Sequence, residues 1–259
     1  IIATAWPTAY KVDRLSPEKG KKFYFIQDFE IWDNEEIVKK SYELPLNKIV
    51  VSSWINQKLK QNLGIGSYPV VYNGLDTEIY HHVNIDKDTN SICFLMLNHT
   101  LPKKGVAEGI KVFEKIREKY PNSKLRMFGF CDSSNVPSYV EYHQNPTKAE
   151  LVKMYSESDI FIFPSLEEGW GLTPLEAMAC GCLVVGTNVG FVQDIGAHKG
   201  NMMISEPGNI EQMIQNIEEL IVDKALQKSI QNEMKNVIMT LDWEKSVDKL
   251  EKIFSQQEG

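Results

Sequence analysis

Apolar residues along this chain gather in short, continuous runs more often than they alternate with polar ones. Continuous runs are typical of strands buried on both faces of a parallel sheet, whereas alternation indicates a sheet with one face in water. The runs predict strands at 23–26, 49–51, 69–72, 92–97, 125–130, 160–163 and 183–185. The opening residues, Ile1 to Thr4, have the pattern of a strand interior.

Between several of these runs, apolar residues recur at steps of three and four, which is the spacing of one helix face. The clearest example is a helix near 106–116, with apolar positions at Val106, Ile110, Phe113 and Ile116. Shorter helices are expected at 149–156 and 174–179, and Gly181 stands where the second of these should end. The alternation of strand and helix predicts a doubly wound α/β fold with parallel sheets.

The final part of the chain has only helical patterns, with amphipathic helices expected at 210–220, 225–239 and 243–254. Upstream, Asn73-Gly74 is a turn signal, and the polar stretch before Ser91 has no periodicity. We therefore expect a linker near 74–90 that divides a partial first domain (1–77) from a complete second domain (78–240). A terminal helix (241–259) follows the second domain. Because the chain begins inside an apolar run and without methionine, we expect a fragment of a longer protein.

The composition excludes some classes of partner. The 259 residues carry a formal net charge of −7, whereas nucleic-acid binding needs a basic face that neutralises phosphates. No apolar run approaches the roughly 20 residues that span a bilayer, and the opening run lacks the basic flank of a secretory signal. One basic stretch fits either a solvated loop or a contact with a membrane surface; it holds Lys11, Arg14, Lys19, Lys21 and Lys22.

Cysteine usage points to no metal or redox centre. Of Cys93, Cys131, Cys180 and Cys182, only the last two are close in sequence, and no second cluster of Cys or His accompanies them. We therefore expect no metal, and a reducing, cytoplasmic setting.

Candidate chemistry concentrates at 163–181, where the sequence is FPSLEEGWGLTPLEAMACG. A buried strand ends here, a loop with Gly169 and Gly171 follows, and a helix is expected with Thr173 as N-cap and Pro174 at its first position. A helix start presents unpaired N–H groups and the positive end of a dipole, which bind anions. The glycines allow close approach of the backbone to a ligand, and ligands of open α/β sheets bind at the carboxyl ends of the strands.

Two carboxylates flank this expected anion site, Glu168 in the loop and Glu176 on the helix. The alternative for Glu176 is a capping box with Thr173, and for Glu168 a solvated loop position. A sugar nucleotide fits the pair, because one carboxylate can accept hydrogen bonds from ribose hydroxyls and the other from the transferred sugar.

This stretch resembles the donor-site motif of group 1 glycosyltransferases, the retaining family four, where two glutamates stand in an E-G-F-G-L…E-A-M-A-x-G context. Glu168 and Glu176 match the family's spacing, with Trp170 in place of the usual Phe. The resemblance implies the two-domain GT-B fold, with Glu168 at the donor sugar and Glu176 at the ribose. It also implies that backbone amides of the loop and helix start bind the donor diphosphate, at Gly169, Gly171, Leu172 and Thr173.

Other segments extend the resemblance. Residues 98–105 are similar to the family's G-R-x-x-x-x-K-G segment: Lys104 matches the lysine that balances the diphosphate, while Asn98 and His99 replace the glycine and the arginine. Histidine is only partly charged near neutral pH. Gly129 and Gly190 match two glycines on the donor side, and the alternative for each is a simple turn.

The first domain and the end of the chain also have counterparts in the family. Family members place a His near the reacting carbon; the segment at that point here suggests Gln27 or Asp28, with a strand-end turn as the alternative. The helix that begins near Trp243 resembles the final helix that crosses back to the first domain.

The resemblance implies a metal-independent, retaining glycosyltransferase of the hexosyl- or rhamnosyltransferase type, without a cofactor. Its partners would be a nucleoside-diphosphate sugar and a glycan or lipid-linked acceptor, with Lys104 and Glu168 as catalytic residues, in the cytoplasm or at the inner membrane face. The alternative hypothesis is a module that binds the donor without turnover, because the first domain is short and His99 replaces an arginine. A dinucleotide-dependent oxidoreductase lacks its G-x-G-x-x-G motif, and no lysine stands out for the pyridoxal phosphate of a phosphorylase.

Overall fold

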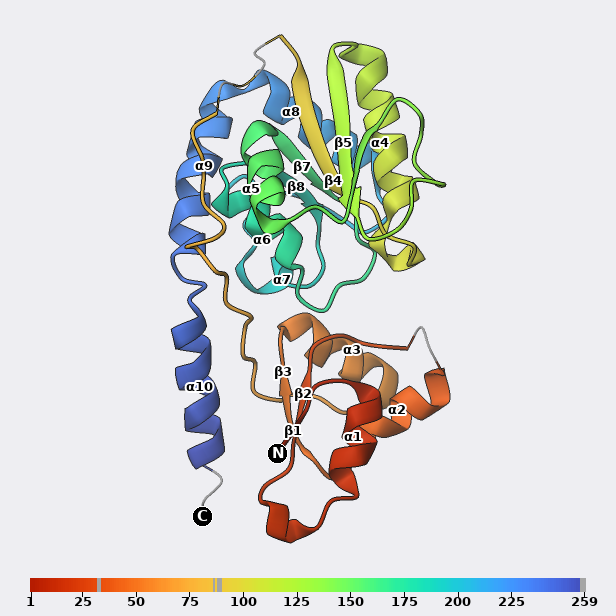
Figure 1. Cartoon of the computed structure of the whole chain (residues 1–259), viewed down its shortest axis with the longest axis vertical. Coiled ribbons are helices and arrows are strands. Elements are labelled where there is room, and N and C mark those ends of the chain that lie inside the picture. The colour runs from red at the N-terminus through yellow and green to blue at the C-terminus, as the bar shows by residue number, and fades with distance from the viewer. Residues whose placement is uncertain (32–33, 86, 88–89, 257–259) are drawn as a thin grey trace.

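Parallel strands form two sheets, one in each half of the elongated molecule (Figure 1). The computed structural model describes residues 1–31, 34–85, 87 and 90–256; parts of the expected linker (74–90) and terminal segment (241–259) lie outside these residues. The first sheet has the order β1-β2-β3, with β1 (Ile2–Ala3), β2 (Phe23–Ile26) and β3 (Asn47–Val50). The second has the order β6-β5-β4-β7-β8-β9, with β4 (Ile92–Leu97), β5 (Ser123–Gly129), β6 (Glu141–Gln144), β7 (Ile160–Phe163), β8 (Leu183–Thr187) and β9 (Met203–Ser205).

Helices connect the strands of both sheets. The first sheet is accompanied by α1 (Trp6–Asp13), α2 (Glu35–Glu43) and α3 (Ser53–Leu63), with a short 3-10 turn η1 (Pro17–Lys19). The second is accompanied by η2 (Pro102–Lys104), α4 (Val106–Lys119), α5 (Lys148–Glu157), α6 (Leu172–Ala179), α7 (Val192–Ile195), α8 (Ile210–Val222) and α9 (Lys224–Ile238), and α10 (Trp243–Ser255) follows. Helix α4 packs with α8, and α6 packs with both α5 and α9.

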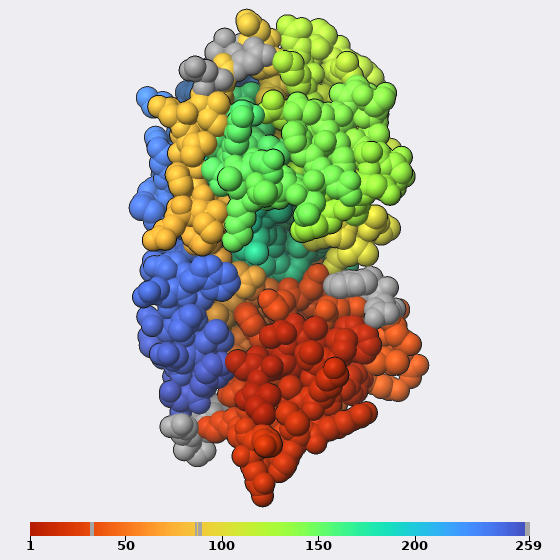
Figure 2. Space-filling model, viewed as in Figure 1, coloured from red at the N-terminus to blue at the C-terminus, as the bar shows by residue number. Residues whose placement is uncertain are grey.

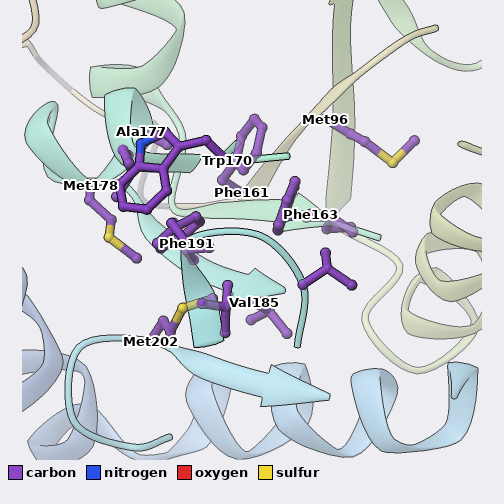
Figure 3. Close-up of a cluster of buried hydrophobic side chains, with 14 of the residues drawn as sticks. Met96, Phe161, Phe163, Trp170, Ala177, Met178, Val185, Phe191 and Met202 are labelled. Atoms are coloured by element: carbon purple, nitrogen blue, oxygen red, sulfur yellow. The ribbon is translucent and has the colours of Figure 1, made fainter. Parts of the chain in front are cut away.

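The core of the second sheet explains why its strands are apolar throughout. In β7 every residue is buried, and in β4 the side chains from Phe94 to Met96 are fully buried. Aromatic and methionine side chains from several elements meet there, among them Phe161, Trp170 and Phe191 (Figure 3). Helices cover both faces of such a sheet, so its strands carry no polar face.

Helix α10 packs against the first sheet although it follows the second in sequence. Phe254 meets Phe23 of β2 edge-on, with ring centroids 4.7 Å apart, and Leu250 and Ile253 pack on the same small cluster, which includes Ile49. In the space-filling view α10 (blue) lies along the red and orange N-terminal part (Figure 2).

The predicted strands and helices are largely confirmed, and the differences have local causes. Residues 69–72 form an isolated bridge, Val50 with Val70, and no strand. The apolar pattern did not predict β6, an edge strand with no buried side chain, or β9, which has three residues. Helices α1 to α3 were not predicted either, although Ile55, Leu59 and Leu63 of α3 recur at steps of four. Gly181 follows α6 in the left-handed conformation, with φ +83°, as predicted.

Candidate functional site

The carboxyl ends of the two sheets face each other. Asp28, just after β2, forms an ion pair with Lys103, which follows β4, with 2.7 Å between Nζ and Oδ2. Ser52, just after β3, donates a hydrogen bond of 2.6 Å from Oγ to the carbonyl oxygen of Gly169, in the loop after β7. Ligands of parallel α/β sheets bind at this edge. A hollow between the two parts of the molecule is visible in Figure 2, with the teal segment around α6 at its floor.

Lys104 and Glu168 form the central ion pair of this region. The lysine Nζ lies 2.8 and 2.7 Å from the two carboxylate oxygens of Glu168. The side chains retain only 17% and 12% exposure, so little water screens the pair. Ser165 donates a further, longer hydrogen bond of 3.4 Å from its Oγ to Glu168 Oε2. Glu168 is therefore a buried, partnered carboxylate, which contradicts the alternative of a solvated loop position.

Helix α6 begins two residues earlier than predicted. Its N-cap is Gly171, with φ +96°, and no side chain caps the helix, so Thr173 as N-cap and Pro174 at the first position were wrong. A left-handed N-cap conformation suits glycine, and Pro174 at the third helical position removes an N–H that has no intrahelical partner. Among the described residues, no side chain caps the first amide groups of α6, from Leu172 and Thr173, and Leu172 is 38% exposed.

Three of the predicted glycines lie where two segments of the backbone pack closely against each other. A Cβ on Gly169 would lie 2.0 Å from the carbonyl oxygen of Gln27, so the close approach predicted for a ligand belongs to the first domain's own chain. A Cβ on Gly190 would lie 2.4 Å from the carbonyl oxygen of Trp170, and one on Gly129 would lie 2.3 Å from that of Asn98. These glycines hold the strand-end loops together at the edge where the candidate site lies.

His99 is placed at the same edge, as a hydrogen-bonded, neutral imidazole. Its Nδ1 accepts a 3.0 Å hydrogen bond from the backbone N–H of Leu101, which leaves the proton on Nε2. Burial, together with Lys104 and Lys103, lowers the pKa of His99. The ring lines a hollow of about 660 Å³ that also involves Asn98 and Leu166. At the position of the family's arginine, this chain therefore offers a neutral N–H donor.

Glu176 is held by tyrosines and forms no capping box. The hydroxyl of Tyr155 in α5 donates a 2.9 Å hydrogen bond to Glu176 Oε2, and Tyr80 interacts with the same carboxylate. Burial raises the pKa of Glu176, and the two tyrosines and Lys148 oppose that rise. The capping-box alternative is wrong because Thr173 is not the N-cap. Neither tyrosine was predicted from the sequence, since neither belongs to a motif and Tyr80 lies in the expected linker.

The two candidates from the first domain differ in position. Gln27 is exposed, and its amide donates to the carbonyl oxygen of Thr4 at 3.3 Å. Asp28, by contrast, is paired with Lys103 in the ion pair described above. Near them, the buried ring of Trp170 stacks on Tyr72 with centroids 4.7 Å apart, so the tryptophan that replaces the family's Phe also joins the two halves.

The described part of the chain has neither a metal-binding cluster nor a membrane-spanning helix. Within residues 1–31, 34–85, 87 and 90–256, no cluster of three His, Cys, Asp or Glu side chains is arranged to hold a metal ion. Among the same residues, no helix is long and apolar enough to span a bilayer. The four cysteines are free.

Comparison with known proteins defines the class. The family described as "Glycosyl transferases group 1" matches residues 80–237, and the chain belongs to that family. Its two parallel sheets and crossing C-terminal helix form the GT-B fold. The fold class predicted from the sequence is thereby confirmed.

Individual relatives are distant and longer. An uncharacterized glycosyltransferase of Methanocaldococcus jannaschii is 27% identical over 213 residues, or 80% of this chain and 59% of its own length. The capsular polysaccharide biosynthesis glycosyltransferase CapM of Staphylococcus aureus is 27% identical over 84% of this chain and 61% of its own length. The structure of Anabaena HepE with UDP-glucose is similar in fold, with a TM-score of 0.82 and 16% identity over 98% of this chain and 78% of that one. The chain thus spans about three fifths of these curated relatives.

Proposed function

We propose that this chain binds a nucleoside-diphosphate sugar between its two sheets and belongs to a retaining glycosyltransferase that passes the sugar to a hydroxyl acceptor. The observation that carries the proposal is the Lys104–Glu168 pair beside the uncapped start of α6. A cation, the backbone amides of a helix start and a carboxylate then meet at the edge where such folds bind ligands.

The departing diphosphate sets the chemical requirement. When the bond from the sugar carbon to the phosphate oxygen breaks, its electron pair remains on the diphosphate, and the acceptor oxygen bonds to the carbon as its hydroxyl loses a proton. Lys104, the amides of Leu172 and Thr173 and the Nε2–H of His99 would stabilise that charge without a metal, because fixed donors in a dry site cost little reorganisation. Retention of configuration rests on the family resemblance.

The two carboxylates would accept hydrogen bonds from hydroxyls of the donor. A diphosphate competes with Glu168 for Lys104, and this competition frees a Glu168 oxygen to accept from a hydroxyl of the transferred sugar. Glu176, on the α5 side of α6, would accept from the ribose. The UDP-glucose complex of the structurally similar HepE supports a nucleotide-sugar donor of this kind.

The direct test is ligand-dependent stability followed by transfer. UDP, GDP, ADP and dTDP are each added to the purified chain, and the melting temperature is measured, because a ligand that binds only the folded state raises it. The nucleotide that binds should lose affinity in Lys104→Met, and Glu168→Ala and Glu176→Ala should abolish transfer by the full-length protein from the corresponding sugar nucleotide. Unchanged melting with all four nucleotides would contradict the proposal.

Donor binding without turnover is the second candidate. Its support is that, within the described residues, the first sheet has three strands and the second has six. Nucleotide binding by the 259-residue chain together with no release of free diphosphate in the presence of acceptor would favour this candidate. Release of diphosphate that depends on acceptor would favour the transferase.

The acceptor is proposed from a relative and from surface charge. CapM is named for capsular polysaccharide biosynthesis, and we infer a glycan or lipid-linked acceptor and a hexosyl or rhamnosyl donor for this chain. Lys11, Arg14 and Lys19 are exposed around α1 and η1, and they would contact an anionic inner membrane face. Co-sedimentation with vesicles of about 30% anionic lipid, compared with neutral vesicles, tests this contact.

A further inference from the structure

The hydroxyl of Tyr155 has an unusual position for a polar group. The side chain is fully buried, and its ring packs edge-on against Phe128 and Phe161, with centroids 5.7 and 5.8 Å away. Its hydroxyl donates to Glu176 Oε2 at 2.9 Å. Because buried hydroxyls require a partner, the ring packing and this hydrogen bond together fix one oxygen of the Glu176 carboxylate.

Tyr80 reaches the same carboxylate from a different part of the chain. It belongs to the segment that connects the two sheets, and its hydroxyl lies near the Glu176 carboxylate that Tyr155 holds by a hydrogen bond. The residues after it fasten this segment to α5 and α6. His82 Nδ1 lies 3.0 Å from the carbonyl oxygen of Cys180, and the N–H of Val83 donates to Ser156 Oγ at 3.2 Å.

Both phenols keep their protons at neutral pH. Burial, followed by the charge of Glu176, raises the pKa of Tyr80 to about 12 and holds the pKa of Tyr155 well above its usual value. An ionised carboxylate has about four acceptor positions, so the hydrogen bond from Tyr155, and one from Tyr80 beside it, would still leave acceptor positions for two further hydroxyls. A ribose presents two neighbouring hydroxyls of this kind.

We propose that Tyr155 and Tyr80 are positioning residues, which orient the Glu176 carboxylate for the 2′- and 3′-hydroxyls of the donor ribose. The proposal rests on the proposed function, since it assumes that a nucleoside diphosphate occupies the site. It also means that the segment between the sheets takes part in donor recognition through Tyr80.

The test separates ribose recognition from binding of the diphosphate. Tyr155→Phe and Tyr80→Phe each remove one hydroxyl, and Tyr139→Phe is the matched control, because Tyr139 donates to Glu114 at 3.0 Å in another part of the surface. Calorimetric titration with UDP, GDP, ADP and inorganic pyrophosphate measures affinity. We expect each site variant to weaken binding of the preferred nucleotide about tenfold, as for a charge-assisted hydrogen bond, with pyrophosphate binding and the control unchanged.

The pH dependence distinguishes positioning from a general structural role. The groups that face Glu176 are Tyr155 and Lys148 from α5, Cys180 after α6, and Tyr80. Removing a phenolic donor raises the pKa of Glu176 further, so the loss of affinity relative to the unsubstituted chain should grow as the pH falls from about 8 to about 6.

Each other outcome overturns the proposal in an identifiable way. Equal losses for nucleotide and pyrophosphate in Tyr80→Phe, or a loss that is constant with pH, would show that the tyrosines only support the fold. If Tyr155→Phe does not fold, Tyr80→Phe decides, because that side chain is partly exposed. If the unsubstituted chain binds pyrophosphate but no nucleotide preferentially, ribose recognition fails while anion binding stands. If it binds none of these four ligands and dTDP does not raise its melting temperature either, the proposed function fails as well.

Discussion

Replacement of Lys104 by methionine, alone and together with Glu168→Gln, should separate the contribution of the ion pair to stability from its contribution to diphosphate binding. Methionine keeps most of the apolar stem and removes the charge, so Glu168 stays buried without its cation. The matched variants are Glu168→Gln, which keeps the size of the side chain, and the double variant. The cycle isolates the ion pair because Lys104 is the cation within 2.8 Å of both Glu168 oxygens.

The magnitude follows from burial. Breaking a buried pair by removing one partner costs about 3–5 kcal/mol, and the residual exposure of 17% and 12% favours the lower end. We therefore expect Lys104→Met to lower the free energy of unfolding by about 3 kcal/mol, or the melting temperature by about 6–12 °C for a chain of this size. The double variant should cost less than the sum of the single variants, by about 1 kcal/mol or more, because it buries no unpaired charge.

The assay combines urea unfolding, followed by tryptophan fluorescence, with titration of the preferred nucleoside diphosphate. Lys104→Met and the double variant should both lose affinity at least about tenfold, since the double variant regains stability but not the cation. Glu168→Gln should keep or increase the affinity for a diphosphate without a sugar, because Lys104 is then released. Additive stabilities together with unchanged affinities would refute the reasoning.

Three further outcomes are expected. The pKa of His99 is lower in the folded chain than its value near 6.5 in the unfolded chain. This shift contributes stability that is present above pH 6.5 and is lost as the pH falls through the folded-state pKa. The melting temperature of His99→Gln should therefore fall less than that of the unsubstituted chain between about pH 8 and pH 5. Gly171→Ala should cost about 1–2 kcal/mol through left-handed strain and weaken nucleotide binding, whereas Gly20→Ala, at a similar φ of +93° in an open loop, should show the strain in urea unfolding without the binding loss. Asp28→Asn should weaken the contact with Lys103 by about 1 kcal/mol and speed limited proteolysis between the sheets, with unchanged cleavage speaking against that contact as a link.

The second sheet and its helices were predictable because their signals are local. Strands buried on both faces are apolar throughout, and helices such as α4 show their period within a dozen residues. The glutamate pair and Lys104 were also found in the sequence, through motif spacing. Their donor-binding roles stay predictions.

The local rules failed where distant parts of the chain decide the conformation. Thr173 and Pro174 have the residue types of a helix start, but α6 begins after Gly171, whose neighbours include the side chain of Phe191 from beyond the next strand. Gly169 is required by the backbone of Gln27, which lies more than a hundred residues away in sequence. No sequence pattern connects such positions.

By itself, then, the sequence determined most strands and helices of the second sheet, and which charged residues stand at strand ends, because burial and spacing are properties of neighbouring residues. The tertiary structure alone decided the partners: Glu168 with Lys104, Glu176 with Tyr155 and Tyr80, and Lys103 with Asp28. The physical reason is that contacts across a fold depend on how the sheets and helices pack, and packing brings together residues whose separation along the chain carries no pattern.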